Sequence, residues 1–135
     1  SFQELLDAAC GFKEQPEKII SGGPMMGFSM FGLDVPTTKT TSALLCMTKD
    51  EVAEADADAT ACINCGRCVE ACPEQIVPSR LSKFSEHGDM AEFEKWHGLE
   101  CVECGSCSFI CPAKRQLAQS IKTMKKTIIA ERKKK

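Results

Sequence analysis

The sequence predicts an α+β protein in two parts, a small mixed unit followed by a mainly helical region. Three observations lead to this fold class. Residues 18–21 and 35–47 are rich in β-branched and apolar side chains, which is typical of strands. Eight of the ten cysteines fall into two evenly spaced groups between residues 62 and 111. After the second group, apolar residues recur every three or four positions, which is typical of a helix.

The beginning of the chain carries the signals of a short helix. Ser1 and Glu4 have the spacing of a capping box, so we expect a helix over residues 1–9. Gly11 is a natural stop for that helix. The chain does not begin with Met, and its first residues lack a basic start and a long apolar stretch. We therefore expect a piece of a longer protein without a secretory signal.

Few strands are expected in the first part. Residues 18–21 should form a strand that enters the glycine-rich turn 22–27, and residues 35–47 should form one or two more. The turn lacks the spacing of a phosphate-binding loop, so a structural role is favoured. Cys10 and Cys46 stand outside the cysteine groups, and we expect both to be small buried apolar residues. Residues 1–48 thus form a small mixed unit.

An acidic, alanine-rich linker over residues 49–60 is expected between the two parts. Thr48 and Glu51 have the spacing to cap a short helix there. No apolar run in the chain approaches the roughly 20 residues that a transmembrane helix requires. A membrane span is therefore not expected.

The two cysteine groups share one spacing, C-x2-C-x2-C-x3-C-P. The first group is Cys62, Cys65, Cys68 and Cys72, and the second, 39 residues later, is Cys101, Cys104, Cys107 and Cys111. This is the ligand run of bacterial iron–sulfur proteins. Gly66 and Gly105 occupy the same place in each loop, where a positive φ or a close approach to the cluster is expected.

The same spacing predicts which cysteines act together. In two-cluster ferredoxins the fourth cysteine of each run binds the other cluster. We expect one [4Fe–4S] cluster on Cys62, Cys65, Cys68 and Cys111, and a second on Cys101, Cys104, Cys107 and Cys72. Two complete sets of four thiolates favour electron transfer over a catalytic cluster with an open iron, so no catalytic residue is predicted.

Zinc and disulfides are the alternatives to iron–sulfur clusters. Structural zinc uses two cysteine pairs with a longer gap between them. Disulfides need an oxidising compartment, and nothing in the sequence indicates export. A zinc-stabilised interaction module remains the competing hypothesis from another functional class.

Helices are expected between and after the cysteine groups. Pro78 should begin a helix that ends at Gly88, and Asp89 should cap a second helix whose apolar residues are Met90, Phe93 and Trp96. This connector predicts a helical two-cluster domain over residues 61–115. A helix over residues 116–135 should bury the stripe Leu117, Ile121, Met124 and Ile128.

The end of the chain is strongly basic. Residues 113–135 contain nine Lys or Arg and a single acidic residue, Glu131. This helix is either a packed helix with a solvated basic face or a dock for an acidic partner or an anionic membrane. Nucleic acid is not an expected partner, because aromatic residues are few and not interleaved with the bases.

Charges near the two cysteine loops differ in the sequence. Glu100 and Glu103 lie at the second loop. Lys114 and Arg115 instead follow Cys111, the expected fourth ligand of the first cluster. Negative charge disfavours the addition of an electron. From sequence order alone, the second cluster should have the lower reduction potential.

Four segments resemble one known family, and together they cover nearly the whole chain. The segments are SGGPMMG (21–27), VPTTKTTSAL (35–44), CINCGRCVEACP (62–73) and ECGSCSFICPAKR (103–115). They resemble the C subunit of the Rnf complex, a membrane-bound, ion-translocating ferredoxin:NAD oxidoreductase. A cobalamin reductase of bacterial microcompartments shares this domain order and is the nearest alternative, and a small diffusible ferredoxin is another.

The resemblance implies fold and function beyond what the spacing does. Residues 1–48 would be the later part of a β-grasp (SLBB-like) domain, and the FMN- and NAD-binding domain would precede it in the full-length protein. This chain would then relay electrons through two [4Fe–4S] clusters without transferring hydride. The resemblance also implies a peripheral position on the cytoplasmic side of the plasma membrane. Its partners would be other subunits of the complex, with ferredoxin a further candidate.

Overall fold

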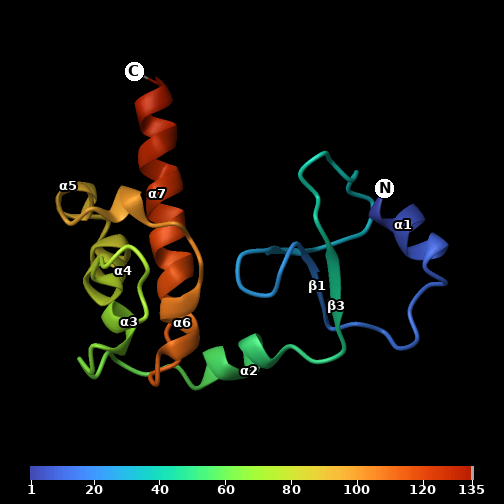
Figure 1. Cartoon of the computed structure of the whole chain (residues 1–135), viewed down its shortest axis with the longest axis horizontal. Coiled ribbons are helices and arrows are strands. Elements are labelled where there is room, and N and C mark those ends of the chain that lie inside the picture. Colours follow the sequence, from blue (N-terminus) through green and yellow to red (C-terminus); the bar gives the residue numbers. More distant parts are fainter. Residues whose placement is uncertain (135) are drawn as a thin grey trace. The chain divides into compact units, whose positions relative to one another are not determined.

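The computed structural model describes residues 1–134, with the side chains of Val52, Ala55 and Asp56 left out. The chain forms two compact units, Ser1–Glu54 and Ala55–Lys135. A three-stranded sheet lies in the first unit and a group of helices makes up the second (Figure 1). The predicted α+β class is confirmed.

The first unit opens with helix α1, Phe2–Ala8. The Ser1 Oγ accepts the Glu4 backbone N–H at 3.3 Å, and the Glu4 carboxylate accepts from the Ser1 amino group at 2.8 Å. This reciprocal pair is the predicted capping box. Phe2 and Leu6 are buried, whereas Leu5 is exposed, and the helix lies within the expected residues 1–9.

The sheet consists of β1 (Lys18–Ser21), β2 (Phe28–Met30) and β3 (Leu44–Met47). Its order is β2-β1-β3, and both pairings are antiparallel. Strand β1 lies where it was predicted. β2 was not anticipated, because three residues are too few for an alternating pattern to be recognised.

The strand expected over residues 35–47 is shorter than predicted, since only its last four residues join the sheet. Thr38 and Thr41 explain the difference. The Thr38 backbone N–H donates to Thr41 Oγ1 at 3.0 Å, and the Thr41 N–H donates to the Thr38 carbonyl at 3.0 Å. Threonine side chains that bond the local backbone compete with ladder pairing, and here the local turn prevails.

The glycine-rich segment between β1 and β2 makes a tight structural turn. The Gly27 N–H donates to the Gly23 carbonyl at 2.9 Å. A Cβ atom on Gly27 would lie 2.5 Å from that carbonyl oxygen. Glycine is therefore required here by close approach of the backbone, as the structural interpretation of the turn predicts.

Helix α2, Glu51–Ala57, begins at a different cap from the predicted one. The Asp50 carboxylate accepts the Ala53 backbone N–H at 3.1 Å and pairs with the Lys18 ammonium at 2.9 Å. Asp50, and not Thr48, therefore supplies the capping oxygen. Cys10 is exposed and Cys46 is half-buried, so the expectation of burial is wrong for Cys10. Cys10 lies in the turn after α1 with φ +68°, outside the packed face of the helix.

The second unit contains the helices α3 (Arg67–Glu70), α4 (Pro78–His87), α5 (Met90–Lys95), α6 (Ser106–Ile110) and α7 (Leu117–Lys134), with a 3-10 turn η1 (Gly98–Glu100). The long α7 packs along α4 (Figure 1). Their shared core contains Ile76, Leu81, Phe93, Ile121, Met124 and Ile128. The predicted apolar stripe of the last helix is confirmed, since its four residues are all buried.

The predicted helix ends between the two cysteine groups are also confirmed. Pro78 occupies the first turn of α4, and Gly88 ends that helix with φ +73°. The Asp89 carboxylate accepts the Glu92 backbone N–H at 3.1 Å at the start of α5. Among residues 1–134, no helix combines the length and the apolar character needed to cross a bilayer.

Candidate metal centre

The two cysteine loops share one backbone path. Positive φ occurs at three pairs of positions, each separated by 39 residues: Asn64 and Glu103 (55° and 58°), Gly66 and Gly105 (76° and 81°), and Gln75 and Lys114 (55° and 52°). The two glycines were expected to adopt this conformation, and they do. The positive φ of the four non-glycine residues at these positions was not predicted. The 39-residue repeat is the one sequence signal that marks them as equivalent positions.

These left-handed residues let each loop curl around a central space. In the second loop the Glu103 backbone N–H donates to Cys101 Sγ at 3.4 Å. The Cys104 thiol donates to Ser106 Oγ at 3.4 Å, and in the first loop the Cys62 thiol donates to Asn64 Oδ1 at 3.8 Å. Backbone N–H groups aimed at sulfur commonly support the ligands of iron–sulfur clusters.

A short helix carries the third cysteine of each group inward. Gly66 and Gly105 precede α3 and α6, and Cys68 and Cys107 on those helices are each only 8% exposed. The chain then turns at a Cys-Pro pair, and the long helices α4 and α7 begin at Pro78 and Leu117, again 39 residues apart. The second unit is thus an internal duplication of loop, short helix and long helix.

Two recesses lie at these loops, and each draws cysteines from both groups. The first recess encloses about 370 Å³, part of it open to solvent, and its cysteines are Cys62, Cys65, Cys68 and Cys111. The second recess spans about 340 Å³, part of it likewise open to solvent, and its cysteines are Cys72, Cys101, Cys104 and Cys107. The structure therefore brings together the same two sets of four that the sequence spacing predicted.

The remaining lining of both recesses is mainly apolar. Ile63, Pro112, Ala113 and Leu117 contribute to the first recess, and Pro73, Ile76, Val102 and Ile121 to the second. Such walls exclude water from one side of a bound group and lower the local dielectric. Four thiols around a mainly apolar recess are the donor set that a [4Fe–4S] cluster requires.

A compact site that could hold one metal ion would bring at least three ligating side chains together. Within the described part of the chain, no three His, Cys, Asp or Glu side chains converge closely enough to hold a single ion. His87 and His97 are exposed and line neither recess.

Burial and neighbouring sulfurs shift the pKa values of the thiols that line the second recess. Burial raises the pKa of Cys107 to about 11, and the nearby Cys101, Cys104 and Cys68 sulfurs add to this rise. Burial also raises the pKa of Cys101, whereas the hydrogen bond to Ser106 lowers the pKa of Cys104. The Cys107 thiol therefore stays protonated at neutral pH in the metal-free chain. A metal that binds there must displace this proton.

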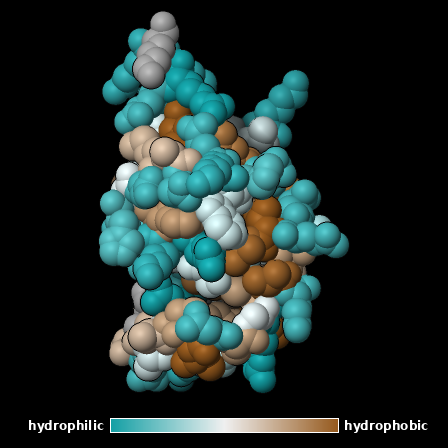
Figure 2. Space-filling model, turned by 90° about the vertical axis from the view of Figure 1, so that its left-hand side faces the viewer, coloured by the Kyte–Doolittle hydropathy of each residue, from teal (hydrophilic) through white to brown (hydrophobic). Residues whose placement is uncertain are grey.

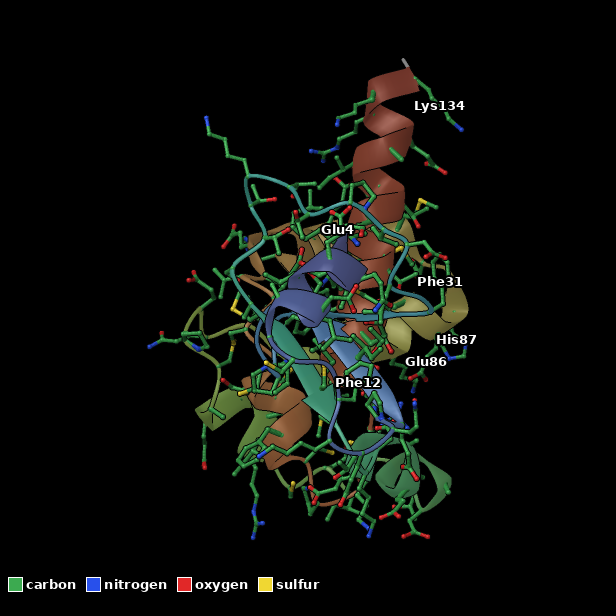
Figure 3. All side chains as sticks on the ribbon, turned by 90° about the vertical axis from the view of Figure 1, so that its right-hand side faces the viewer. Glu4, Phe12, Phe31, Glu86, His87 and Lys134 are labelled. Atoms are coloured by element: carbon green, nitrogen blue, oxygen red, sulfur yellow. The ribbon has the colours of Figure 1, made fainter. Side chains whose placement is uncertain are left out.

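Ion pairs change the charge picture expected from sequence order. Near the first recess, Arg115 pairs with Glu86 and Lys114 pairs with Asp58, so each base is matched by one acid. Glu86 lies at the end of α4, where Figure 3 labels it beside His87. In the second loop, Glu103 lies between two lysines of α7 (3.7 and 3.6 Å). The expectation of an excess negative charge at the second loop is therefore wrong, because helix packing supplies the compensating bases.

The surface of the second unit is not uniformly polar. Figure 2 shows a patch of apolar side chains among hydrophilic ones on the face of the second unit that is turned towards the viewer. The exposed large apolar residues of the unit are Ile63, Val102, Phe109, Ile110 and Ile129. Ile63 and Val102 are equivalent residues, each directly after the first cysteine of its loop. The cysteine loops thus present apolar side chains to the outside as well as to the recesses.

Comparison with known proteins agrees with this architecture. Residues 61–115 match the family model of the 4Fe–4S dicluster domain. The chain is 44% identical, over 98% of its length, to the C subunit of the Na(+)-translocating ferredoxin:NAD(+) oxidoreductase complex of Acetobacterium woodii. It is 47% identical over 93% of its length to the proton-translocating counterpart of Clostridium ljungdahlii. It is 33% identical over 96% of its length to the C subunit of the ion-translocating oxidoreductase complex of Methanosarcina acetivorans.

The match covers only part of each relative. The chain spans 30%, 27% and 29% of the lengths of these three proteins. Within that part the match includes both units, since it extends over nearly the whole chain. Residues 61–115 are therefore a 4Fe–4S dicluster domain, and the chain belongs to the family of C subunits of ion-translocating (Rnf) oxidoreductase complexes.

Proposed function

We propose that this chain is the electron-relay part of a complex that couples electron exchange between ferredoxin and NAD to ion translocation. The observation that carries the proposal is the composition of the two recesses. Each is lined by three cysteines of one group and the fourth cysteine of the other. The names of the relatives support the larger context, because they describe ion-translocating oxidoreductases.

Two [4Fe–4S] clusters are the proposed cofactors. Cys62, Cys65, Cys68 and Cys111 would hold the first, and Cys101, Cys104, Cys107 and Cys72 the second. Such a cluster, when bound, accepts and releases one electron at a time. The residues of the chain would provide the thiolate ligands, the Glu103 backbone N–H that faces the Cys101 sulfur, and the apolar walls that exclude water.

The rest of the activity is assigned to parts of the protein outside this chain. FMN and NAD would bind in the larger share of the full-length protein, since this chain spans about 30% of its relative. Residues 1–48 are proposed to belong to a β-grasp (SLBB-like) domain, residues 49–60 to a linker, and residues 116–135 to the basic helix. The dicluster domain itself would transfer electrons only.

The proposed location is peripheral, on the cytoplasmic side of the plasma membrane, in contact with other subunits of the complex. The names of the relatives support membership of a multi-subunit assembly. The exposed apolar residues Ile63 and Val102 on the cysteine loops support partner contacts near the clusters. Ferredoxin is a candidate partner.

Anaerobic purification followed by absorption spectroscopy and metal analysis tests the cofactor. We expect a brown protein that contains iron and sulfide and bleaches with dithionite. A colourless, zinc-containing protein would overturn the proposal and favour an interaction module.

Two matched variants test the crossed ligand sets. Cys72→Ala should disturb the EPR signal of the cluster on Cys101, Cys104 and Cys107. Cys111→Ala should disturb the signal of the other cluster. Loss of the cluster on the same cysteine group in each variant would show uncrossed ligation and refute the assignment.

A further inference from the structure

The last helix holds the second cysteine loop through two lysines. The Lys125 ammonium donates to the backbone carbonyl of Cys101 at 2.6 Å. The same Nζ lies 3.6 Å from Glu103 Oε1, and Lys122 Nζ lies 3.7 Å from Glu103 Oε2. Helix α7 therefore contacts the loop at its first cysteine and at Glu103, whose backbone N–H donates to the sulfur of that cysteine.

These charges are partly removed from solvent. The side chains of Lys125, Lys122 and Glu103 are 19%, 24% and 27% exposed. Partly buried charges are screened less by salt and water than exposed ones, so their field reaches the neighbouring recess. Lys122 and Lys125 carry two positive charges, and the acids that line this recess, Glu103 and Glu74, carry two negative ones.

The first loop has a different electrostatic environment. The position equivalent to Glu103 is the neutral Asn64. The bases that follow Cys111, Lys114 and Arg115, are each matched by one acid. The duplicated loops are therefore alike in backbone and unlike in charge.

We propose that Lys125 and Lys122 raise the reduction potential of the second cluster by placing two positive charges beside the loop of Cys101, where they offset the acids that line the recess. Reduction adds negative charge to a cluster, and a nearby positive charge stabilises the reduced form. Lys125 is in addition a positioning residue, because its bond to the Cys101 carbonyl holds the start of the loop. This inference rests on the proposed function, which supplies the clusters.

An EPR-monitored redox titration of the cluster-loaded protein tests the inference. The second cluster is identified as the signal that Cys104→Ala disturbs. Lys122→Met and Lys125→Met should each move its potential to a more negative value, and the double variant should move it further. Lys125→Arg keeps the charge and should restore the wild-type potential.

The opposite shift provides the sharpest comparison. Glu103→Gln removes the negative charge and leaves both lysines in place, so the potential of the second cluster should become more positive. Simple damage to the loop would not move the potential in opposite directions in the lysine and glutamate variants. Lys126→Met, at the exposed lysine next to Lys125, is the matched control and should leave both potentials unchanged.

The outcomes separate this inference from the function on which it rests. Unmoved potentials in the double lysine variant, with iron content retained, would overturn the tuning role and leave the relay function standing. A wild-type protein without iron would overturn both. If Lys125→Met fails to retain its cluster, Lys122→Met and Glu103→Gln decide the result, because neither removes the bond to the Cys101 carbonyl. Equal shifts of both clusters would also refute the inference.

Discussion

Phe93 provides a direct test of how the connector between the cysteine groups supports the second unit. Its ring is fully buried in the core between α4 and α7. A Cβ atom on Gly98 would collide with the ring, so the turn after α5 closes directly over it. Phe93→Ala would leave a cavity that this tightly closed site cannot readily fill.

The expected loss of stability follows from complete burial. Phe→Ala changes in protein cores lower the free energy of unfolding by about 3–5 kcal/mol. For a domain of 60–100 residues, each kcal/mol lowers the midpoint of thermal unfolding by about 4–8 °C. The apparent midpoint of the second unit should therefore fall by about 12–40 °C.

Thermal unfolding of the cluster-loaded protein, followed by far-ultraviolet circular dichroism under anaerobic conditions, measures this effect. Phe109→Ala is the matched control, because Phe109 is 81% exposed in the same unit. A surface substitution of this kind should change stability by no more than about 0.5 kcal/mol. If the two variants unfold at the same temperature, Phe93 is not a core residue and the packing described above is wrong.

Three further predictions concern the backbone and the metal. Gly66→Ala places a side chain at φ +76° and should lower the free energy of unfolding by about 1 kcal/mol, measured as a faster loss of cluster absorbance. Gly32→Ala is the control, because its φ is outside the left-handed range and the space around it is open. Gly27→Ala should loosen the turn between β1 and β2 and increase proteolysis within residues 1–54, whereas cluster absorbance should be retained. Chelation under air should unfold residues 61–115, since eight thiols without metal gain no binding energy, and unchanged helical dichroism would contradict this.

Several features of the molecule follow from local sequence patterns. The capping box of Ser1 and Glu4, the Pro78 start and Gly88 end of α4, and the buried stripe of α7 each depend on residues within a few positions of one another. The crossed sets of cysteines lie further apart but follow from a repeated spacing. The proline after the fourth cysteine of each group directs the chain out of its own loop and towards the other one.

Other local features could not be predicted from such patterns. Strand β2 is three residues long, and the threonines of residues 37–41 prefer their own turn to the sheet. Asn64 and Glu103 adopt positive φ although neither is glycine, because the loop they belong to is closed by its helices. In the threonine segment a local turn prevails over sheet pairing, and in the cysteine loops the closed backbone path imposes a conformation that the residue type alone does not predict.

The sequence by itself predicted which cysteines line each recess and which face of the last helix is buried. The tertiary structure alone decided the charge around each loop. Sequence order places Lys114 and Arg115 near the first cluster and leaves Glu103 without a counter-charge. Packing of α7 instead brings Lys125 to Cys101 across 24 positions of the chain, and Arg115, just before this helix, pairs with Glu86 across 29 positions. Periodicity and spacing act over a few bonds, whereas electrostatic fields depend on distance through space, which only the folded chain defines.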